Sequence, residues 1–159
     1  MSTDATLREL TDAGVAGLTV SWADNNGIPR SRTVPISALD QVAETGIGVT
    51  SLFAVFDSSD AITYAHPGLS TPSGDTRLVP DLGRVTRLAG QPALAWAPGN
   101  LVSADGTPWP YDQRGVLQRQ VAALAERGLT ALAGWELEFT LHRGDEPAHH
   151  GPAYGPAAP

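Results

Sequence analysis

The chain has 159 residues, of which 42% are apolar, a proportion typical of a folded protein with a buried core. The formal net charge is −7 and the ten Lys and Arg residues are scattered, so a nucleic-acid partner is not expected, because phosphate backbones are bound by clustered positive charge. Cysteine is absent, and residues 1–30 lack the apolar core of a signal peptide. No run approaches the roughly 18 apolar residues of a membrane span. These three features favour a cytoplasmic protein with no membrane partner.

The first part of the sequence predicts a short helix followed by a β-hairpin. Residues 3–13 have leucines one helical turn apart and are followed by a glycine that ends the helix. Apolar residues alternate with polar ones over 18–22, as in a half-buried strand. The sequence D-N-N-G at 24–27 predicts a tight turn, because Asn and Gly tolerate positive φ, and 28–35 then returns as the partner strand.

The middle of the sequence predicts a second helix and several short strands. Residues 37–44 have apolar positions at helical spacing, and the β-rich run 47–56 is followed by a long loop over 57–75. Further strand candidates are 77–80, 85–88 and 94–96. Two strands, a helix and more strands is the order of a β-grasp, so we expect an α+β domain of this kind over residues 1–104, although other small α+β folds share the order.

The remaining residues, 105–159, predict the beginning of a second unit. A Gly- and Pro-rich connector covers 100–111, Asp112 is a good N-cap for a helix over 113–127, and 129–141 has the alternation of a strand. One helix and one strand cannot bury a core by themselves, so this second unit is expected to be incomplete.

The segment G-W-E-L-E-F-T-L at 134–141 carries the clearest chemical signal. In a strand, Glu136 and Glu138 would lie on one face, about 7 Å apart, with apolar side chains on the other face. Carboxylate oxygens suit Mg²⁺ or Mn²⁺, so the pair predicts ligands for hard cations. An ordinary amphipathic strand with a solvated glutamate face gives the same pattern without any function.

Four segments in the correct order resemble the glutamine synthetase family. The run L-T-V-S-W-A-D-N-N-G-I-P-R-S-R-T-V-P-I-S-A at 18–38 is similar to the family's opening hairpin, with its D-x-x-G turn and V-x-I-P. F-D-S-S at 56–59 is similar to F-D-G-S-S, and G-D-T-R-L-V-P-D at 74–81 is similar to S-D-x-x-L-x-P-D. The segment 134–141 matches G-x-E-x-E-F-x-L. The resemblance implies an N-terminal β-grasp domain followed by an incomplete glutamine synthetase catalytic domain.

The resemblance also implies an activity, cofactors and partners. Members of this family use ATP to join ammonium to glutamate through γ-glutamyl phosphate, with Mg²⁺ or Mn²⁺ as cofactor, in homo-oligomers whose active sites lie at subunit junctions. By similarity Glu136 would bind the cation at the ATP phosphates and Glu138 the cation nearer the glutamate. Asp57 matches the aspartate that enters the neighbouring subunit's site and binds and deprotonates ammonium.

Three alternatives remain open at this point. Ser58 stands where the family has glycine and the following loop is longer, which would suit an acceptor such as a polyamine or ethanolamine. Asp57 has the simpler interpretation of a turn-capping residue. The resemblance covers about the first third of such an enzyme, so the 159 residues alone are expected to be inactive. A free-standing β-grasp interaction module is the alternative from another class.

Overall fold

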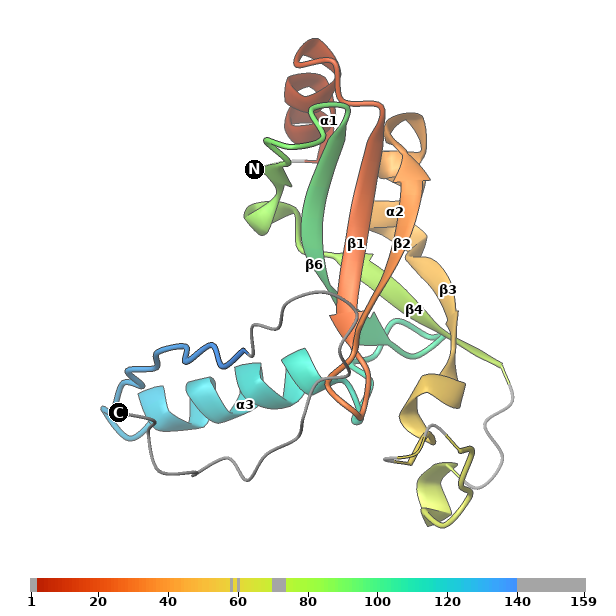
Figure 1. The fold of residues 1–159 in the computed structure, drawn as a ribbon, viewed down its shortest axis with the longest axis vertical. Helices are drawn as coiled ribbons and strands as arrows, with labels where there is room; N and C mark the ends of the chain where they lie inside the picture. The colour runs from red at the N-terminus through yellow and green to blue at the C-terminus, as the bar shows by residue number, and fades with distance from the viewer. Residues whose placement is uncertain (1–2, 58, 60, 70–73, 140–159) are drawn as a thin grey trace, which may run out of the picture.

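The computed structural model describes residues 3–57, 59, 61–69 and 74–139, and its centre is a six-stranded mixed sheet (Figure 1). The strand order is β2-β1-β6-β4-β3, with β5 paired to β6 outside this path. β1 (Gly17–Ala23) and β6 (Leu94–Val102) are parallel neighbours, and the other strand pairs are antiparallel. The remaining strands are β2 (Pro29–Pro35), β3 (Ile47–Thr50), β4 (Asp75–Pro80) and β5 (Thr86–Arg87). The first and last strands lie parallel at the centre of the sheet, so the fold is the expected β-grasp.

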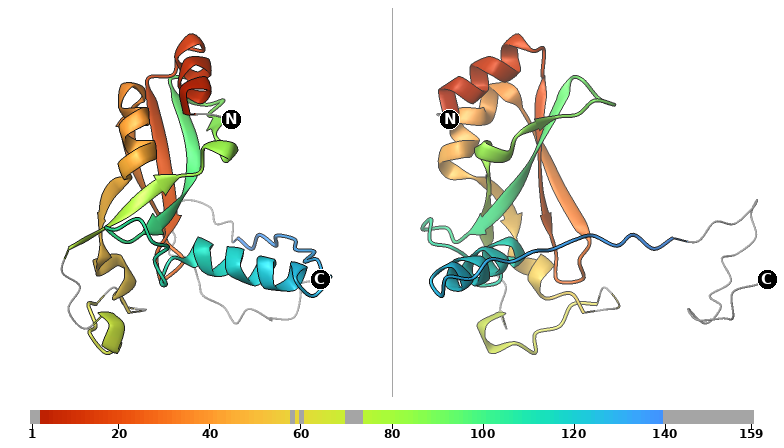
Figure 2. Two further views of the ribbon diagram at one scale, coloured as in Figure 1. Left: turned by 180° about the vertical axis from the view of Figure 1, so that it is seen from behind. Right: turned by 90° about the vertical axis from the view of Figure 1, so that its left-hand side faces the viewer.

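Two helices cover one face of this sheet, as the turned views show (Figure 2). They are α1 (Thr3–Asp12) and α2 (Leu39–Thr45), and the short 3₁₀ turn η1 (Ile36–Ala38) leads into α2. Leu10 of α1 and Leu39 of α2 belong to the same buried cluster as Leu18 and Val20 of β1. The core therefore lies between the two helices and the sheet, and the alternation over 18–22 correctly predicted which face of β1 is buried.

Close packing at the sheet centre requires one glycine. A Cβ atom added at Gly99 of β6 would lie 2.4 Å from Leu78 Cδ1 and 2.8 Å from Val20 Cγ1. Both contacts are shorter than side chains tolerate, so the leucine and the valine occupy the space that a larger residue would need. This position explains why a glycine interrupts an otherwise ordinary strand.

The middle of the chain differs from the sequence prediction at two places. The expected strand over 47–56 ends at Thr50, and the 3₁₀ turn η2 (Ser51–Ala54) follows, because the Thr50 hydroxyl accepts a hydrogen bond from Leu52 N at 3.3 Å. Conversely, β6 continues to Val102 instead of ending at residue 96, because β1 and β4 pair with its two edges. The connector thus begins after Val102. Two further 3₁₀ turns are η3 (Pro67–Leu69) and η4 (Leu82–Arg84).

The last described helix projects away from the sheet (Figure 1). It is α3 (Gln113–Ala125), and it begins as predicted because the Asp112 carboxylate accepts a hydrogen bond from Gly115 N at 2.8 Å. None of its residues is buried. No helix in the described part of the chain is long and apolar enough to cross a membrane.

The strand predicted over 129–141 is wrong for the residues that the structure describes. Residues 129–139 have no regular secondary structure, and 140–141 lie outside the described residues. A strand needs a neighbour to satisfy its backbone N–H and C=O groups, and none of the described strands pairs with this segment. Its apolar side chains are correspondingly exposed: Trp135 98%, Leu137 87% and Phe139 79%.

Candidate functional site at the Asp57 loop

The segment that carries Asp57 is a closed loop at the end of the sheet opposite α1. We call residues 55–63 the Asp57 loop; residues 58 and 60 lie outside the described part. Phe56 and Ile62 form a single antiparallel bridge, and Thr63 N donates to Val55 O at 2.8 Å. These contacts bring the two ends of the loop together and present Asp57 to solvent near its tip.

The Asp57 carboxylate uses one of its two oxygens within the loop. Its Oδ1 accepts hydrogen bonds from Ser59 N at 2.8 Å and Ala61 N at 3.0 Å, while Asp57 N donates to Ala61 O at 2.9 Å. Oδ2 accepts no hydrogen bond from the described residues. Asp57 therefore does cap a turn, as its simpler interpretation requires, and its second carboxylate oxygen is not used by that cap.

The turn between β1 and β2 lies against this loop. Asn26 Nδ2 donates to Asp57 O at 2.8 Å, and Asn25 Nδ2 donates to Ala54 O. Gly27 ends the turn with a φ of +74°, a value that glycine adopts without strain. The predicted D-N-N-G turn is thus confirmed, and its two asparagine side chains reach a segment about 30 residues further along the chain.

The buried side chain of Asp24 holds the turn together through hydrogen bonds. Its fully buried carboxylate accepts from Asn26 N at 2.9 Å, from Ile28 N at 3.0 Å and from Arg30 Nε at 2.8 Å. Burial alone would raise the pKa of Asp24, but the hydrogen bonds from Ile28, Arg30 and Asn26, with the Arg30 charge, lower that pKa below its usual value. The ionised carboxylate is therefore favoured, and it fixes both the turn and the arginine.

Arg30 extends the same cluster toward the Asp57 loop. Its guanidinium lies 5.2 Å from the centre of the Phe53 ring, a cation–π contact. Phe53 in turn makes edge-to-face contacts with Trp22 at 5.4 Å and with Phe56 at 5.8 Å between ring centres. Phe56, at the start of the Asp57 loop, is thus linked through Phe53 to the arginine that pairs with Asp24.

The start of α3 is bound to this end of the sheet by polar side chains. Gln113 Nε2 donates to Asn25 Oδ1 at 2.7 Å, and Arg114 forms an ion pair with Asp81 at 2.5 Å and donates to Asn100. Asp112, at the N-cap, is buried, and burial raises the pKa of its carboxyl although several backbone N–H groups oppose the shift. The first turn of α3 therefore has a fixed position relative to the Asp57 loop.

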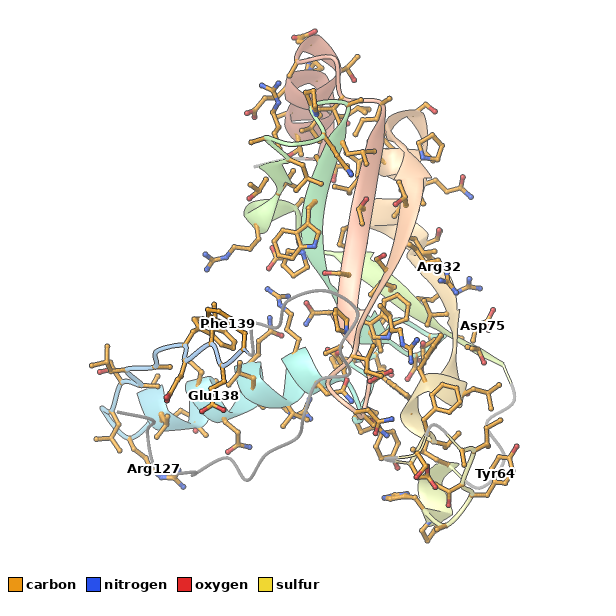
Figure 3. All side chains as sticks on the ribbon, in the orientation of Figure 1. Arg32, Tyr64, Asp75, Arg127, Glu138 and Phe139 are labelled. Carbon is orange, nitrogen blue, oxygen red and sulfur yellow. The ribbon has the colours of Figure 1, made fainter. Side chains whose placement is uncertain are left out.

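The two glutamates expected to bind metal are not brought close to Asp57. Glu136 and Glu138 are exposed in the irregular segment after α3, and Figure 3 shows Glu138 on the opposite side of the molecule from Tyr64, which follows the Asp57 loop. Within the described residues no three His, Cys, Asp or Glu side chains are grouped so that they could hold a metal ion. The carboxylate chemistry suits Mg²⁺, but two ligands do not make a complete site, so the described residues alone do not fit the ion.

Sequence reasoning missed the side chains that hold the Asp57 loop. The sequence predicts Asn25 and Asn26 only as turn formers, and Gln113 only as the first residue of a helix. The available signal was two consecutive amide side chains at the tip of a turn. Their partners could not be identified, because Ala54 and Asp57 are 29 and 31 residues away along the chain.

Comparisons with known proteins agree on one family. The family model described as the glutamine synthetase N-terminal domain matches residues 8–109. A γ-glutamylpolyamine synthetase of Streptomyces coelicolor is 44% identical over 156 residues, covering 94% of this chain and 33% of that protein. A glutamine synthetase of Pyrococcus abyssi is 32% identical over 126 residues, covering 77% of this chain and 25% of that protein.

A solved structure supports the fold independently. The structure of a GmaS–ADP complex superposes with a TM-score of 0.62 and 22% identity, covering 77% of this chain and 26% of that one. The present chain thus spans between a quarter and a third of the length of the proteins that it matches.

Proposed function

Since the chain belongs to the glutamine synthetase family, we propose that it is the N-terminal part of an ATP-dependent γ-glutamyl ligase whose acceptor amine is a polyamine. The 44% identity to a γ-glutamylpolyamine synthetase over 94% of the chain is the observation that carries the choice of amine. Because that match spans 33% of the relative, the proposal concerns the full-length protein that contains these residues.

The proposed reaction has two steps that share one activated intermediate. A γ-carboxylate oxygen of glutamate attacks the γ-phosphorus of ATP, so that γ-glutamyl phosphate forms and ADP leaves. The amine nitrogen then attacks the γ-carbonyl carbon, the C–N bond forms, the C–O bond to phosphate breaks, and inorganic phosphate leaves. A cationic amine must lose one proton before its nitrogen can attack, and the nitrogen loses a second proton as the amide forms, so the site needs a group that binds a cationic amine and accepts a proton.

Asp57 is the residue of this chain that suits the second step. Its Oδ1 is committed to Ser59 N and Ala61 N, which orients the carboxylate, while Oδ2 accepts no hydrogen bond from the described residues and the residue as a whole is exposed. A carboxylate oxygen attracts an ammonium group and accepts its proton. We propose that Asp57 completes the active site of a neighbouring subunit in a homo-oligomer. Its exposure supports that arrangement, as does the position of Glu138 on the opposite side of the molecule from Tyr64, which follows the Asp57 loop (Figure 3).

Glu136 and Glu138 are proposed as two ligands of the divalent cations, Mg²⁺ or Mn²⁺. Such cations, when bound, neutralise the charge that develops on phosphate during transfer. The two carboxylates lie two residues apart and are exposed in the described structure, so they are accessible to further ligands. Their role requires additional groups that the described residues do not supply.

Ammonia is the second candidate acceptor. The 32% identity to a glutamine synthetase favours it, and Asp57 would serve an ammonium ion through the same oxygen. The two candidates share the phosphorylation of glutamate and differ only in the amine. A comparison of amines therefore decides between them.

The full-length protein provides the test. With ATP, glutamate and Mg²⁺, we expect phosphate release that depends on putrescine or spermidine, and a loss on the order of 100- to 10,000-fold in Asp57→Asn. Asp75→Asn, an exposed carboxylate of β4, is the matched control and should retain full activity. Activity with ammonium alone would select the second candidate, and no activity with any amine would overturn the proposal.

The 159-residue chain by itself is expected to be inactive. Two exposed glutamates do not supply enough ligands for Mg²⁺, and the described residues contain no cluster of three or more His, Cys, Asp or Glu side chains that could hold a metal ion. Phosphate release from the purified chain with ATP, glutamate and amine should not exceed that of its Glu138→Ala variant. A clear difference between the two would show that this segment carries a working site.

A further inference from the structure

We propose that Asn25 and Asn26, at the tip of the β1–β2 turn, are positioning residues that set the location of the Asp57 carboxylate. This inference rests on the proposed function, because it assigns a task to residues that touch the Asp57 loop and not the substrate. It concerns two side chains that form hydrogen bonds to segments outside the turn.

Asn26 holds the peptide that carries Asp57. With described residues, the Asp57 backbone and one carboxylate oxygen make four hydrogen bonds: three to Ser59 and Ala61 inside the loop, and one from Asn26 Nδ2 to Asp57 O at 2.8 Å. Within the described part of the chain, Asn26 supplies the side-chain hydrogen bond that reaches Asp57 from outside the loop. The internal bonds fix the shape of the loop, whereas this bond fixes where the loop lies.

Asn25 connects the same loop to α3. Its Nδ2 donates to Ala54 O, just before the loop begins, and its Oδ1 accepts from Gln113 Nε2 at 2.7 Å. Both ends of one amide are therefore used, each by a different segment. Through Asn25, the first residue of α3 and the residue that leads into the Asp57 loop share one anchor.

The β1–β2 turn that carries the two asparagines is itself held by internal contacts, as a positioning role requires. Asp24 is fully buried and accepts from two backbone N–H groups of the turn and from Arg30. Arg30 lies over Phe53, which precedes the loop, so the turn and the loop entrance are also joined through a cation–π contact. A functional group is placed accurately when the residues behind it are locked by packing and hydrogen bonds.

The expected consequence is a loss of amine reactivity without a loss of phosphorylation. A displacement of about 1 Å at a reacting group can lower a rate by about 100-fold. In the full-length protein, Asn26→Ala should therefore lower kcat/KM for the amine by about 10- to 100-fold. The KM values for ATP and glutamate should stay unchanged, because neither substrate needs the Asp57 oxygen. Ser31→Ala, on the exposed side of the same hairpin, is the matched control.

A double-mutant cycle with Asp57 separates positioning from general damage. If Asn26 acts through Asp57, Asn26→Ala should cause no further loss in a protein that already carries Asp57→Asn. Hydrogen exchange of peptides covering 55–63 should become faster in Asn26→Ala, while exchange in β1 and β6 stays unchanged. If the alanine variant does not fold, Asn26→Asp keeps a turn-forming residue and removes the same donor.

The outcomes distinguish this proposal from the proposed function. Full activity of Asp57→Asn would overturn the role of Asp57, and the positioning role with it. A large loss in Asp57→Asn together with unchanged kinetics and unchanged exchange in Asn26→Ala would overturn only the positioning role. Equal losses from Asn26→Ala in both backgrounds would also overturn it, since the effect would then not pass through Asp57.

Discussion

Residues 3–112 and residues 113–139 both carry apolar side chains at regular spacing, but they bury them to opposite extents. In the first region Leu18 and Leu78 are fully buried between the sheet and its helices. In the second, Leu117 is 62% exposed and Trp135 is 98% exposed. The same kind of pattern thus gives a closed core in one region and an open surface in the other. Periodicity shows which side of an element will be covered, but it does not show whether a partner is present to cover it.

The join between the two regions is polar. Gln113 and Arg114 bind Asn25, Asn100 and Asp81 through hydrogen bonds and one ion pair. The start of α3 is thus held in place although its apolar residues are not covered. Single substitutions on each side of this join test whether the two regions differ in solution as they do in the structure.

Matched leucine substitutions should show the largest difference. Leu78→Ala removes a fully buried side chain of β4 and leaves a cavity, so we expect the free energy of unfolding to fall by about 2–5 kcal/mol. Leu117→Ala in α3 should change it by no more than about 0.5 kcal/mol, because this side chain is mostly exposed. Urea unfolding of both variants measures the difference. Similar losses would mean that α3 is packed in solution.

Removing the buried carboxylate of the β1–β2 turn should have the next largest effect. Asp24→Ala leaves two backbone N–H groups and Arg30 without their shared acceptor, which should cost about 1.5–3 kcal/mol. Asp75→Ala, an exposed aspartate of β4, serves as the control. An Asp24→Ala protein as stable as this control would show that the turn does not depend on its buried acceptor.

The two buried aspartates should respond to pH in opposite directions. The pKa of Asp24 is lowered in the fold, so its contribution to stability is present above its usual value of 3.8 and is lost as the pH falls through the lower, folded value. The pKa of Asp112 is raised by burial, so stability is lost as the pH rises from 3.8 through the folded value. Urea midpoints from acid to neutral pH check this. Relative to the parent, Asp112→Asn should gain stability as the pH rises over that window.

The smallest effect is expected at the join. Arg114→Ala removes an ion pair whose side chains are 27% and 31% exposed, so the loss should be about 0.2–1 kcal/mol. Hydrogen exchange in the first turn of α3 should increase, while exchange in β6 should not. A combined Arg114→Ala and Asp81→Ala protein should lose little more than either single variant, and fully additive losses would contradict a direct pair.

Features that depend on neighbours a few residues apart could be predicted from the amino-acid sequence alone. The Asp112 carboxylate caps α3 by accepting a hydrogen bond from Gly115 N, three residues further along. The D-N-N-G turn is closed by hydrogen bonds from Asn26 N and Ile28 N to Asp24. The alternation over 18–22 likewise gave the buried face of β1. The motif order gave the family, because the four segments could be compared without any coordinates. The roles of Asp57, Glu136 and Glu138 remain predictions.

Features that depend on partners distant along the chain became visible only in the folded structure. β6 runs to Val102 because β1 and β4 pair with it, and 129–139 forms no strand because none of the described strands lies beside it. The attachment of the Asp57 loop to Asn25 and Asn26 joins residues about 30 positions apart. The backbone N–H and C=O groups of a strand are satisfied by a neighbouring strand that can be distant in sequence. A local sequence pattern therefore does not show whether those hydrogen bonds form.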